Sequence, residues 1–281
     1  MAAVTFRDML EARWVEADTM VCVGLDPELA KFPLSLRSLP SVHDALLAFF
    51  KPLIDATAPY ACAFKPQIAH FAALGAESAL VELIAYIRSA HPAVPVILDS
   101  KRGDIGSTAG FYAVEAFERF NSHAVTVNPY LGLDGVEPFL SYADRGVIIL
   151  CRTSNPSAGD FQDLLVDGRP LYQHVAARVA SSWNAGGQCS LVVGATWPSQ
   201  LREVRNIVGD SVPFLVPGVG AQGGKASDVV DNAATSDGYG LMINSSRGII
   251  YASSGEDFAA AAGAAARSLR DEIRAASAVN R

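Results

Sequence analysis

Eight short apolar runs recur along most of the chain, and they constrain its fold more than any other feature of the sequence. Several of them are rich in Val and Ile and are apolar at consecutive rather than alternate positions. This pattern is typical of parallel strands that are covered on both faces. We therefore predict a strand at each run. The runs span residues 21–25, 61–65, 94–99, 124–129, 146–151, 190–195, 213–218 and 240–244.

Helical stretches alternate with these runs. They span residues 42–57, 77–90, 109–120, 171–186 and 199–209. An amphipathic helix is expected within residues 1–19, and an Ala-rich helix from Phe258 onwards. Eight strands that alternate with helices predict an α/β protein, a single (β/α)8 TIM barrel, with residues 1–281 as one domain. The alternative is an open doubly wound sheet, but its dinucleotide fingerprint G-x-G-x-x-G is absent after the first run.

The composition argues against several classes of function. Hydrophobic residues make up 50% of the chain and charged residues 18%, which suits a large core and not a disordered chain. The net charge of −7 and the lack of a Lys/Arg-rich run argue against nucleic-acid and membrane-surface partners. No apolar run reaches the roughly 18 residues of a membrane span, and residues 1–19 lack the apolar core of a signal peptide. We expect a cytoplasmic protein.

The cysteines and histidines do not suggest a metal site. Cys22, Cys62, Cys151 and Cys189 lie in or beside apolar runs, without a C-x-x-C pair. We expect them to be buried free thiols in a reducing compartment. The five histidines are scattered and lack the spacing of metal ligands.

Charged residues follow the predicted strands at the edge where barrel enzymes collect their catalytic groups. They are Asp26 after the first run, Lys65 at the end of the second, and Asp99, Lys101 and Asp104 in a D-x-K-x-x-D motif at the third. Taken singly, each has a structural explanation as a turn former, a solvated lysine or a salt bridge. Together they form an array of mixed charges in which each member keeps its neighbours ionised. Apolar residues in place of such an array often give a protein that is no less stable, so stability alone seldom explains the array. A function explains it better, and the residue types predict lysine–carboxylate catalysis.

The last two predicted strands indicate the kind of ligand. The segment "PGVGAQGGKA" follows the seventh run, and "NSSRG", which contains Arg247, follows the eighth. Barrel enzymes commonly bind phosphate at these two loops. Glycine lets backbone N–H groups approach an anion closely, and a guanidinium binds phosphate in a bidentate manner. We therefore predict a small phosphorylated substrate, and nothing in the sequence calls for a cofactor.

Five motifs, "GLDP", "FKPQ", "LDSKRGDIGSTA", "PGVGAQGG" and "SSRG", occur in this order between Asp26 and Arg247. With them the sequence resembles the orotidine 5′-phosphate decarboxylase family. The resemblance implies a lyase, a carboxy-lyase that converts orotidine 5′-monophosphate to UMP and CO2 in pyrimidine biosynthesis. It also implies that the reaction needs no metal or other cofactor, and that the protein is a homodimer.

The resemblance further implies roles for the charged residues. Lys101 would protonate pyrimidine C6 as CO2 departs, and Asp99 would lie against the substrate carboxylate. Loss of CO2 leaves a carbanion in the plane of the ring, so a fixed ammonium must stabilise the developing charge. Carboxylates on both sides of Lys101 favour its charged form. Asp26 and Lys65 would bind the ribose hydroxyls and anchor the network.

Three further groups of contacts follow from the resemblance. A hydroxyl after the fifth run would touch the pyrimidine, and this group belongs to either Thr153 or Ser154. The residues that would reach across a dimer interface into the neighbouring site are Asp104, Ile105 and Thr108. Those that would bind or line the phosphate end are Pro217, Gly218, Gln222 and Arg247. Residues 219–226 and 153–169 are candidate closing segments, and the second is longer than an ordinary βα loop.

Three other functions remain open. A metal-dependent sugar-phosphate decarboxylase of the same superfamily would place a carboxylate at the end of the second strand, where this chain has Lys65. A Schiff-base aldolase would need a neutral amine at Lys65 or Lys101, which neighbouring carboxylates disfavour. A barrel that binds a nucleotide without catalysis is the third alternative.

Overall fold

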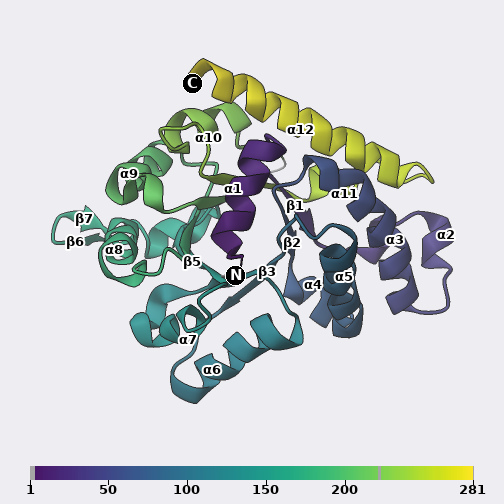
Figure 1. Ribbon diagram of the computed structural model, residues 1–281, viewed down its shortest axis with the longest axis horizontal. Coiled ribbons are helices and arrows are strands. Elements are labelled where there is room, and N and C mark those ends of the chain that lie inside the picture. Colours follow the sequence, from purple (N-terminus) through teal and green to yellow (C-terminus); the bar gives the residue numbers. More distant parts are fainter. Residues whose placement is uncertain (1–3, 221–222, 281) are drawn as a thin grey trace.

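Eight parallel strands form a near-closed barrel in the computed structural model, which describes residues 4–220 and 223–280 (Figure 1). The strand order is β2-β1-β10-β9-β8-β5-β4-β3. Two isolated bridges, Phe64 to Val96 and Gln67 to Asp99, connect β2 to β3 at the two ends of this order and so nearly close the barrel. The strands are β1 (Val21–Leu25), β2 (Ala63–Pro66), β3 (Ile97–Arg102), β4 (Ala124–Val127), β5 (Gly146–Arg152), β8 (Cys189–Val193), β9 (Phe214–Pro217) and β10 (Leu241–Ser245). The predicted TIM barrel is confirmed, and each predicted strand overlaps one of these.

Helices cover the outside of the barrel (Figure 1). Their bounds are α1 (Phe6–Glu16), α2 (Leu34–Arg37), α3 (Val42–Thr57), α4 (Ile68–Ala72), α5 (Glu77–Ala90), α6 (Gly106–Val114), α7 (Glu137–Leu140), α8 (Leu171–Arg178), α9 (Pro198–Val208), α10 (Ala226–Ala233), α11 (Arg247–Ile250) and α12 (Phe258–Asn280). The prediction was right at both ends for α3 and α5, and it gave no bounds for α2, α4, α7, α10 and α11. None of the described helices combines the length and apolar character of a membrane span.

Two helices differ from their predicted form. Helix α6 continues as a π-helical turn over Glu115–Arg119, and α8 continues as one over Val179–Trp183. The predicted stretches at 109–120 and 171–186 are therefore composite. A small antiparallel hairpin, β6 (Leu165–Val166) with β7 (Arg169–Pro170), lies between β5 and α8.

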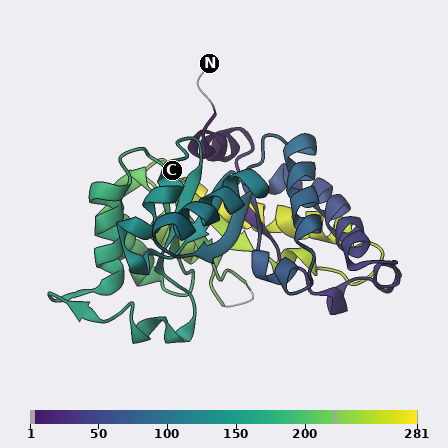
Figure 2. The ribbon, with the colours of Figure 1, turned by 90° about the horizontal axis from the view of Figure 1, so that it is seen from below.

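Helix α1 lies across the amino-terminal end of the barrel (Figures 1 and 2). Phe6 packs so closely on Gly146, the first residue of β5, that a Cβ there would lie 2.1 Å from the ring. The Trp14 indole donates a hydrogen bond of 2.9 Å to the carbonyl of Leu241, the first residue of β10. The helix thus covers the end of the barrel opposite to the one at which barrel enzymes hold their sites.

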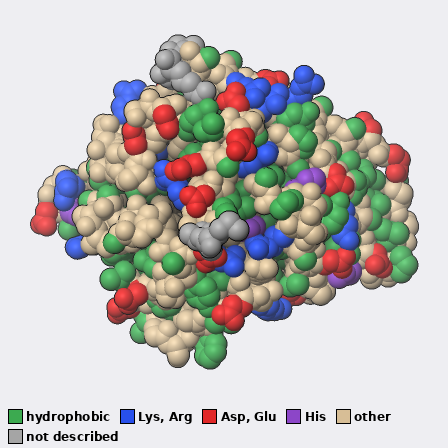
Figure 3. Space-filling view, in the orientation of Figure 1, with side chains coloured by type: hydrophobic (Ala, Val, Ile, Leu, Met, Phe, Trp, Pro, Cys, Tyr) green, Lys and Arg blue, Asp and Glu red, His purple; other side chains and the backbone are tan. Residues whose placement is uncertain are grey.

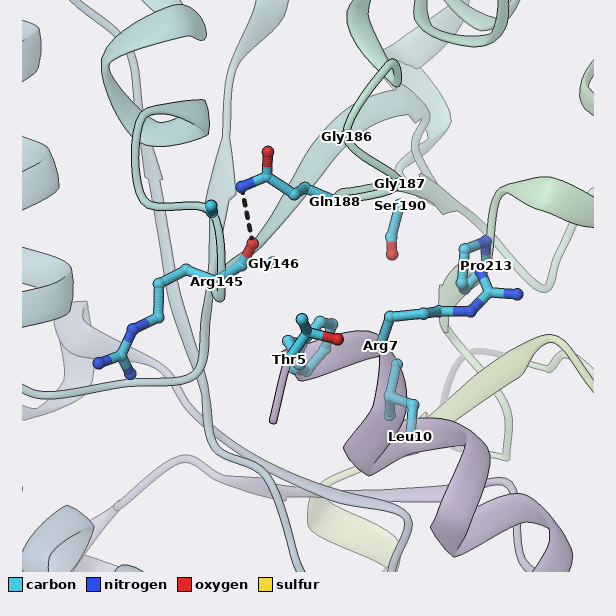
Figure 4. Close-up of a pocket in the computed structure, with 12 residues that line it drawn as sticks. Thr5, Arg7, Leu10, Arg145, Gly146, Gly186, Gly187, Gln188, Ser190 and Pro213 are labelled. Carbon is cyan, nitrogen blue, oxygen red and sulfur yellow. Dashed lines mark hydrogen bonds between the residues drawn. The ribbon is translucent and has the colours of Figure 1, made fainter. Parts of the chain in front are cut away.

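The covered end carries little sign of a ligand site. A cavity of about 160 Å³ lies beside α1, and Gln188 bridges it by donating to the carbonyl of Arg145 at 3.2 Å (Figure 4). Acidic and basic side chains lie side by side on this face (Figure 3), as is usual for a solvated surface.

The four cysteines are buried free thiols, as expected. Burial raises the pKa of Cys22, Cys151 and Cys189 to about 12, so these thiols stay neutral and act as small apolar side chains.

Candidate active site

Asp99 is the centre of a charged cluster at the carboxyl end of the barrel strands. Its Oδ2 atom lies 2.8 Å from Lys65 Nζ, and its Oδ1 atom lies 2.6 Å from Lys101 Nζ. Lys65 is 4% exposed and Asp99 is 6% exposed. The two lie on β2 and β3, the strands that close the barrel, so three of the predicted charged residues meet at one place.

The buried pair of Lys65 and Asp99 is ionised in both members. Burial works against the charge on Lys65, but the attraction of Asp99 and Asp26 outweighs it and raises the pKa of the ammonium above its ordinary value. Burial likewise opposes the charge on Asp99, but Lys65 and Lys101 outweigh it and lower the pKa of the carboxyl well below its ordinary value. Each charge therefore depends on the other.

Lys101 stands on an irregular part of β3. Its φ of +49° is in the left-handed region, which is uncommon for a residue with a side chain. The pairing of β3 with β4 shifts in register between Leu98 and Arg102. The Lys101 side chain is 44% exposed, in contrast to the buried Lys65, so its ammonium is accessible from the cavity above the strands.

A cavity of about 450 Å³ opens beside this cluster, a size that suits a small-molecule ligand. One part of its wall is charged, and another is apolar. The lining residues are Lys65, Asp99, Lys101, Thr126, Leu150, Thr153, Ser154, Asn155, Gln162, Val192, Leu215 and Pro217. Thr153 and Ser154, predicted at the pyrimidine, and Pro217, predicted at the phosphate end, therefore line the same cavity as the charged cluster.

The two candidate hydroxyls after β5 differ in their partners. The amide of Thr153 donates to Gln162 Oε1 at 2.8 Å, and its hydroxyl accepts from Gln162 Nε2 at 2.9 Å. The Thr153 hydroxyl also donates to Asn155 Oδ1 at 2.6 Å. Among the described residues, the Ser154 hydroxyl has no such partner. Ser154 is therefore the one whose hydroxyl is available to a ligand.

The long segment after β5 is held by an ion pair between the buried Arg152 and Asp163, whose side chain is 42% exposed. Arg152 is 1% exposed, and its Nε and Nη2 atoms each donate to the Asp163 carboxylate at 2.9 Å. Its guanidinium also lies over the Trp197 ring, 4.4 Å from the centroid. Gln162, next to Asp163, is thereby placed in the cavity wall. Sequence reasoning missed Gln162, because nothing in the pattern of 153–169 marks it.

Asp26 has a free acceptor at the edge of the cluster. Its carbonyl accepts a hydrogen bond of 3.0 Å from the Tyr251 hydroxyl, which fixes the backbone. Its Oδ1 atom is buried and has no hydrogen-bond partner among the described residues. A buried acceptor without a donor is unfavourable, so this oxygen is suited to a donor on a ligand.

Fewer of the residues predicted at the phosphate end lie together than of those predicted at the charged cluster. Pro217 ends β9, Gly218 is buried, and Arg247 begins α11 on the surface. The sequence predicted that this loop offers backbone N–H groups to an anion, but the amides of Gly220, Gly223 and Gly224 donate to carbonyls within the loop. Gln222 lies outside the described residues.

Asp104, Ile105 and Thr108, which the resemblance assigns to a neighbouring site, do not line this cavity, and neither do Asp26, Gly218 and Arg247. The Asp104 carboxylate accepts a hydrogen bond of 2.8 Å from the amide of Ile105. Ile105 is 54% exposed, and Thr108 lies on the exposed face of α6. Asp104, Ile105 and Thr108 all follow β3 in the sequence and lie outside the lining of this cavity.

Comparisons with known proteins agree with this architecture. The family model described as Orotidine 5′-phosphate decarboxylase / HUMPS family matches residues 19–262. An orotidine 5′-phosphate decarboxylase of Bordetella pertussis is 58% identical over 273 residues, which cover 97% of this chain and 99% of the relative. One from Janthinobacterium sp. is 56% identical over 270 residues, 96% of this chain and 98% of the relative.

Solved structures show the same fold. The Leishmania donovani OMP decarboxylase superposes with a TM-score of 0.84 at 39% identity, over 98% of this chain and 99% of that one. The UMP synthase of the same organism gives a TM-score of 0.83 at 40% identity over 97% of this chain, which spans only 57% of that longer protein.

Proposed function

The chain belongs to the orotidine 5′-phosphate decarboxylase / HUMPS family, and from this premise we propose that it converts orotidine 5′-monophosphate to UMP and CO2 without a cofactor. The observation that carries the proposal is the Lys65–Asp99–Lys101 cluster at the cavity. A cytoplasmic location is part of the proposal, because four buried free cysteines suit a reducing compartment.

Lys101 is the proposed proton donor. When the bond between C6 and the carboxylate breaks, its electron pair stays on C6, in the plane of the ring. An ammonium held 2.6 Å from Asp99 is a fixed positive charge beside that position, and it supports the carbanion before it transfers its proton to C6. The partly exposed side chain of Lys101 suits this role better than the buried Lys65.

Other residues would bind the nucleotide. The unpartnered Oδ1 atom of Asp26 suits a ribose hydroxyl, with the Lys65 ammonium beside it. The Ser154 hydroxyl is the better candidate for a polar edge of the pyrimidine, while Thr153 holds Gln162. Arg247 would bind the phosphate with Gln222, at the end of the cavity lined by Pro217, with Gly218 next to it.

We also propose that the active form is a homodimer in which Asp104, Ile105 and Thr108 complete the neighbouring site. The large apolar side chains Ile105, Phe111 and Tyr130 are 54%, 73% and 80% exposed near the ends of β3 and β4. Exposed apolar groups of this kind are typical of a surface that is covered on assembly. The three proposed residues do not line the cavity of their own chain, which supports a role in the site of a partner.

Mixing two inactive variants tests this arrangement. Lys101→Ala and Asp104→Ala proteins are each expected to be inactive. Exchange of subunits creates dimers in which one site has both Lys101 and Asp104, so turnover should return. If subunits exchange, as followed by a mass tag, and no activity returns, the shared site is wrong.

The activity itself is tested by following the loss of orotidine 5′-monophosphate absorbance in excess EDTA. Wild-type protein should consume the substrate, and folded Lys101→Ala protein should not. Turnover that stops in EDTA would favour the metal-dependent sugar-phosphate decarboxylase, although the Lys65 ammonium would repel a cation at that position. Binding of UMP without any turnover would leave a non-catalytic barrel.

A further inference from the structure

We propose that Thr126 is a positioning residue that sets the place of the Lys101 ammonium and the orientation of the Asp99 carboxylate. This inference rests on the proposed function, since its readout is the decarboxylation step. Thr126 lies in β4 and is 1% exposed. It is one of four residues in the cavity wall that take part in the charged cluster: Lys65, Asp99, Lys101 and Thr126.

The hydrogen bonds of Thr126 use the full capacity of its hydroxyl. A hydroxyl can donate one hydrogen bond and accept two. Thr126 Oγ1 accepts from the amides of Ser100 and Lys101, each at 2.9 Å. Its proton therefore points to the remaining neighbour, Asp99 Oδ1, at 2.9 Å. The direction of this proton is fixed by the two amides, and the hydroxyl has no freedom to turn away from the carboxylate.

The backbone of β3 explains why a side chain is needed here. Leu98 is paired with Val125, and Arg102 is paired with Val127. The three residues between Leu98 and Arg102 thus lie opposite the single residue Thr126. A regular ladder cannot supply partners for the amides of the extra residues, and buried amides without partners are unfavourable. The Thr126 hydroxyl supplies the missing acceptor for two of them.

The bulged backbone carries the proposed proton donor. Lys101 adopts a φ of +49°, a conformation that persists only where surrounding contacts hold it. Its amide is held by Thr126, and its ammonium is held by Asp99, which Thr126 also holds. Loss of the Thr126 hydroxyl would remove the acceptor for the Lys101 amide and one of the hydrogen bonds that orient Asp99, the partner of the Lys101 ammonium. We expect this to affect the chemical step, because it displaces Lys101 without removing a residue that binds the ribose or phosphate.

Replacement of Thr126 by valine tests the inference, since valine has a similar shape and no hydroxyl. In single-turnover assays with orotidine 5′-monophosphate, Thr126→Val should lower kcat by about 10²-fold, while KM and the affinity for UMP change little. Thr126→Ser, which keeps the hydroxyl, should restore most of kcat. Thr57→Val is the matched control, because Thr57 is also fully buried and its hydroxyl donates only to helix α3 carbonyls.

The outcomes separate this inference from the proposed function. If the wild-type protein and Thr57→Val do not turn over the substrate, the proposed function fails. If they do and Thr126→Val has normal kcat, the positioning role is wrong. It is also wrong if serine fails to restore kcat in a folded protein. Should the valine variant not fold, Thr126→Cys against Thr126→Ser gives the same comparison, because a thiol is a weak hydrogen-bonding group.

Discussion

The two ends of the cavity are built in different ways. At the charged end, Lys65, Asp99 and Thr126 are buried and hold one another through short hydrogen bonds. At the proposed phosphate end, Arg247 is exposed, and the amides of Gly220, Gly223 and Gly224 donate to carbonyls of their own loop. In the first region Lys65, Asp99 and Lys101 are already paired with one another, whereas the second presents an exposed guanidinium. Electrostatic catalysis needs groups that are in place beforehand, whereas a binding loop can be organised by its ligand.

The largest expected effect comes from removing the proposed proton donor. Lys101→Ala should lower kcat by about 10⁴-fold, near the upper end of the effect of general acid catalysis. The affinity for UMP should change far less, because Lys101 acts on C6 and not on the phosphate. Stopped-flow absorbance and equilibrium binding measure the two effects. Substantial turnover in this variant would show that the charged end does not hold the proton donor.

Loss of the central carboxylate should be the most destabilising change at the charged end. Asp99→Asn leaves the Lys65 ammonium buried without its partner, and breaking such a pair typically costs about 3–5 kcal/mol. Urea unfolding measures the change. The exposed pair of Glu28 and Lys31 provides the control, since Glu28→Gln should cost less than about 1 kcal/mol. Equal effects of the two variants would contradict the contrast between buried and exposed charges.

The phosphate end should respond in binding and not in stability. Arg247→Ala removes a charge-assisted hydrogen bond worth about 1.5–3 kcal/mol, so kcat/KM should fall by about 10- to 10²-fold. Unfolding in urea should be almost unchanged, because the side chain is exposed. Arg267→Ala on α12, which is also exposed, should leave kcat/KM unaltered. If Arg247→Ala behaved like that control, the phosphate would bind elsewhere.

A fall in pH should reduce the contribution of the charged end to the free energy of unfolding. The pKa of Asp99 is lowered by folding, so its contribution to stability is complete above the ordinary aspartate pKa of about 3.9. That contribution is lost as the pH falls below this value, by at most about 1.4 kcal/mol per pH unit for one group. Urea unfolding at pH 5 and pH 3 should show a steeper loss for wild type than for Asp99→Asn. Parallel losses would mean that other carboxylates dominate.

The sequence predicted the charged end of the site much better than the rest. Lys65 and Asp99 each end a predicted apolar run, and the ends of such runs can be read from the sequence alone. Thr126 could not be predicted, because its role depends on a bulge in the neighbouring strand. Gln162 could not be found either, since its place depends on the pairing of Arg152 with Asp163, for which the sequence has no periodic signal.

Helices were likewise predicted well only where the sequence carries a periodic or capping signal. Helix α3 has a clear start, since the Ser41 hydroxyl accepts from the Asp44 amide at 3.0 Å, and a continuous apolar face. The π-helical turn at Glu115–Arg119 keeps the same apolar residues and changes only the backbone hydrogen bonds, which an apolar pattern does not report. The directions of the Gly220 and Gly224 amides could not be predicted either, because they too depend on backbone hydrogen bonds that an apolar pattern does not report.

The position of helix α1 limits the routes by which a substrate can enter the barrel and products can leave it. Its Phe6 and Trp14 side chains are bound to the amino-terminal ends of β5 and β10, so that end of the barrel is occupied by packed side chains. Under the proposed reaction, the nucleotide must arrive and both products must depart at the carboxyl end. The released CO2 would then leave by the opening at which the candidate closing segments, residues 219–226 and 153–169, were predicted. A loop that shuts too tightly on UMP would also delay the exit of CO2.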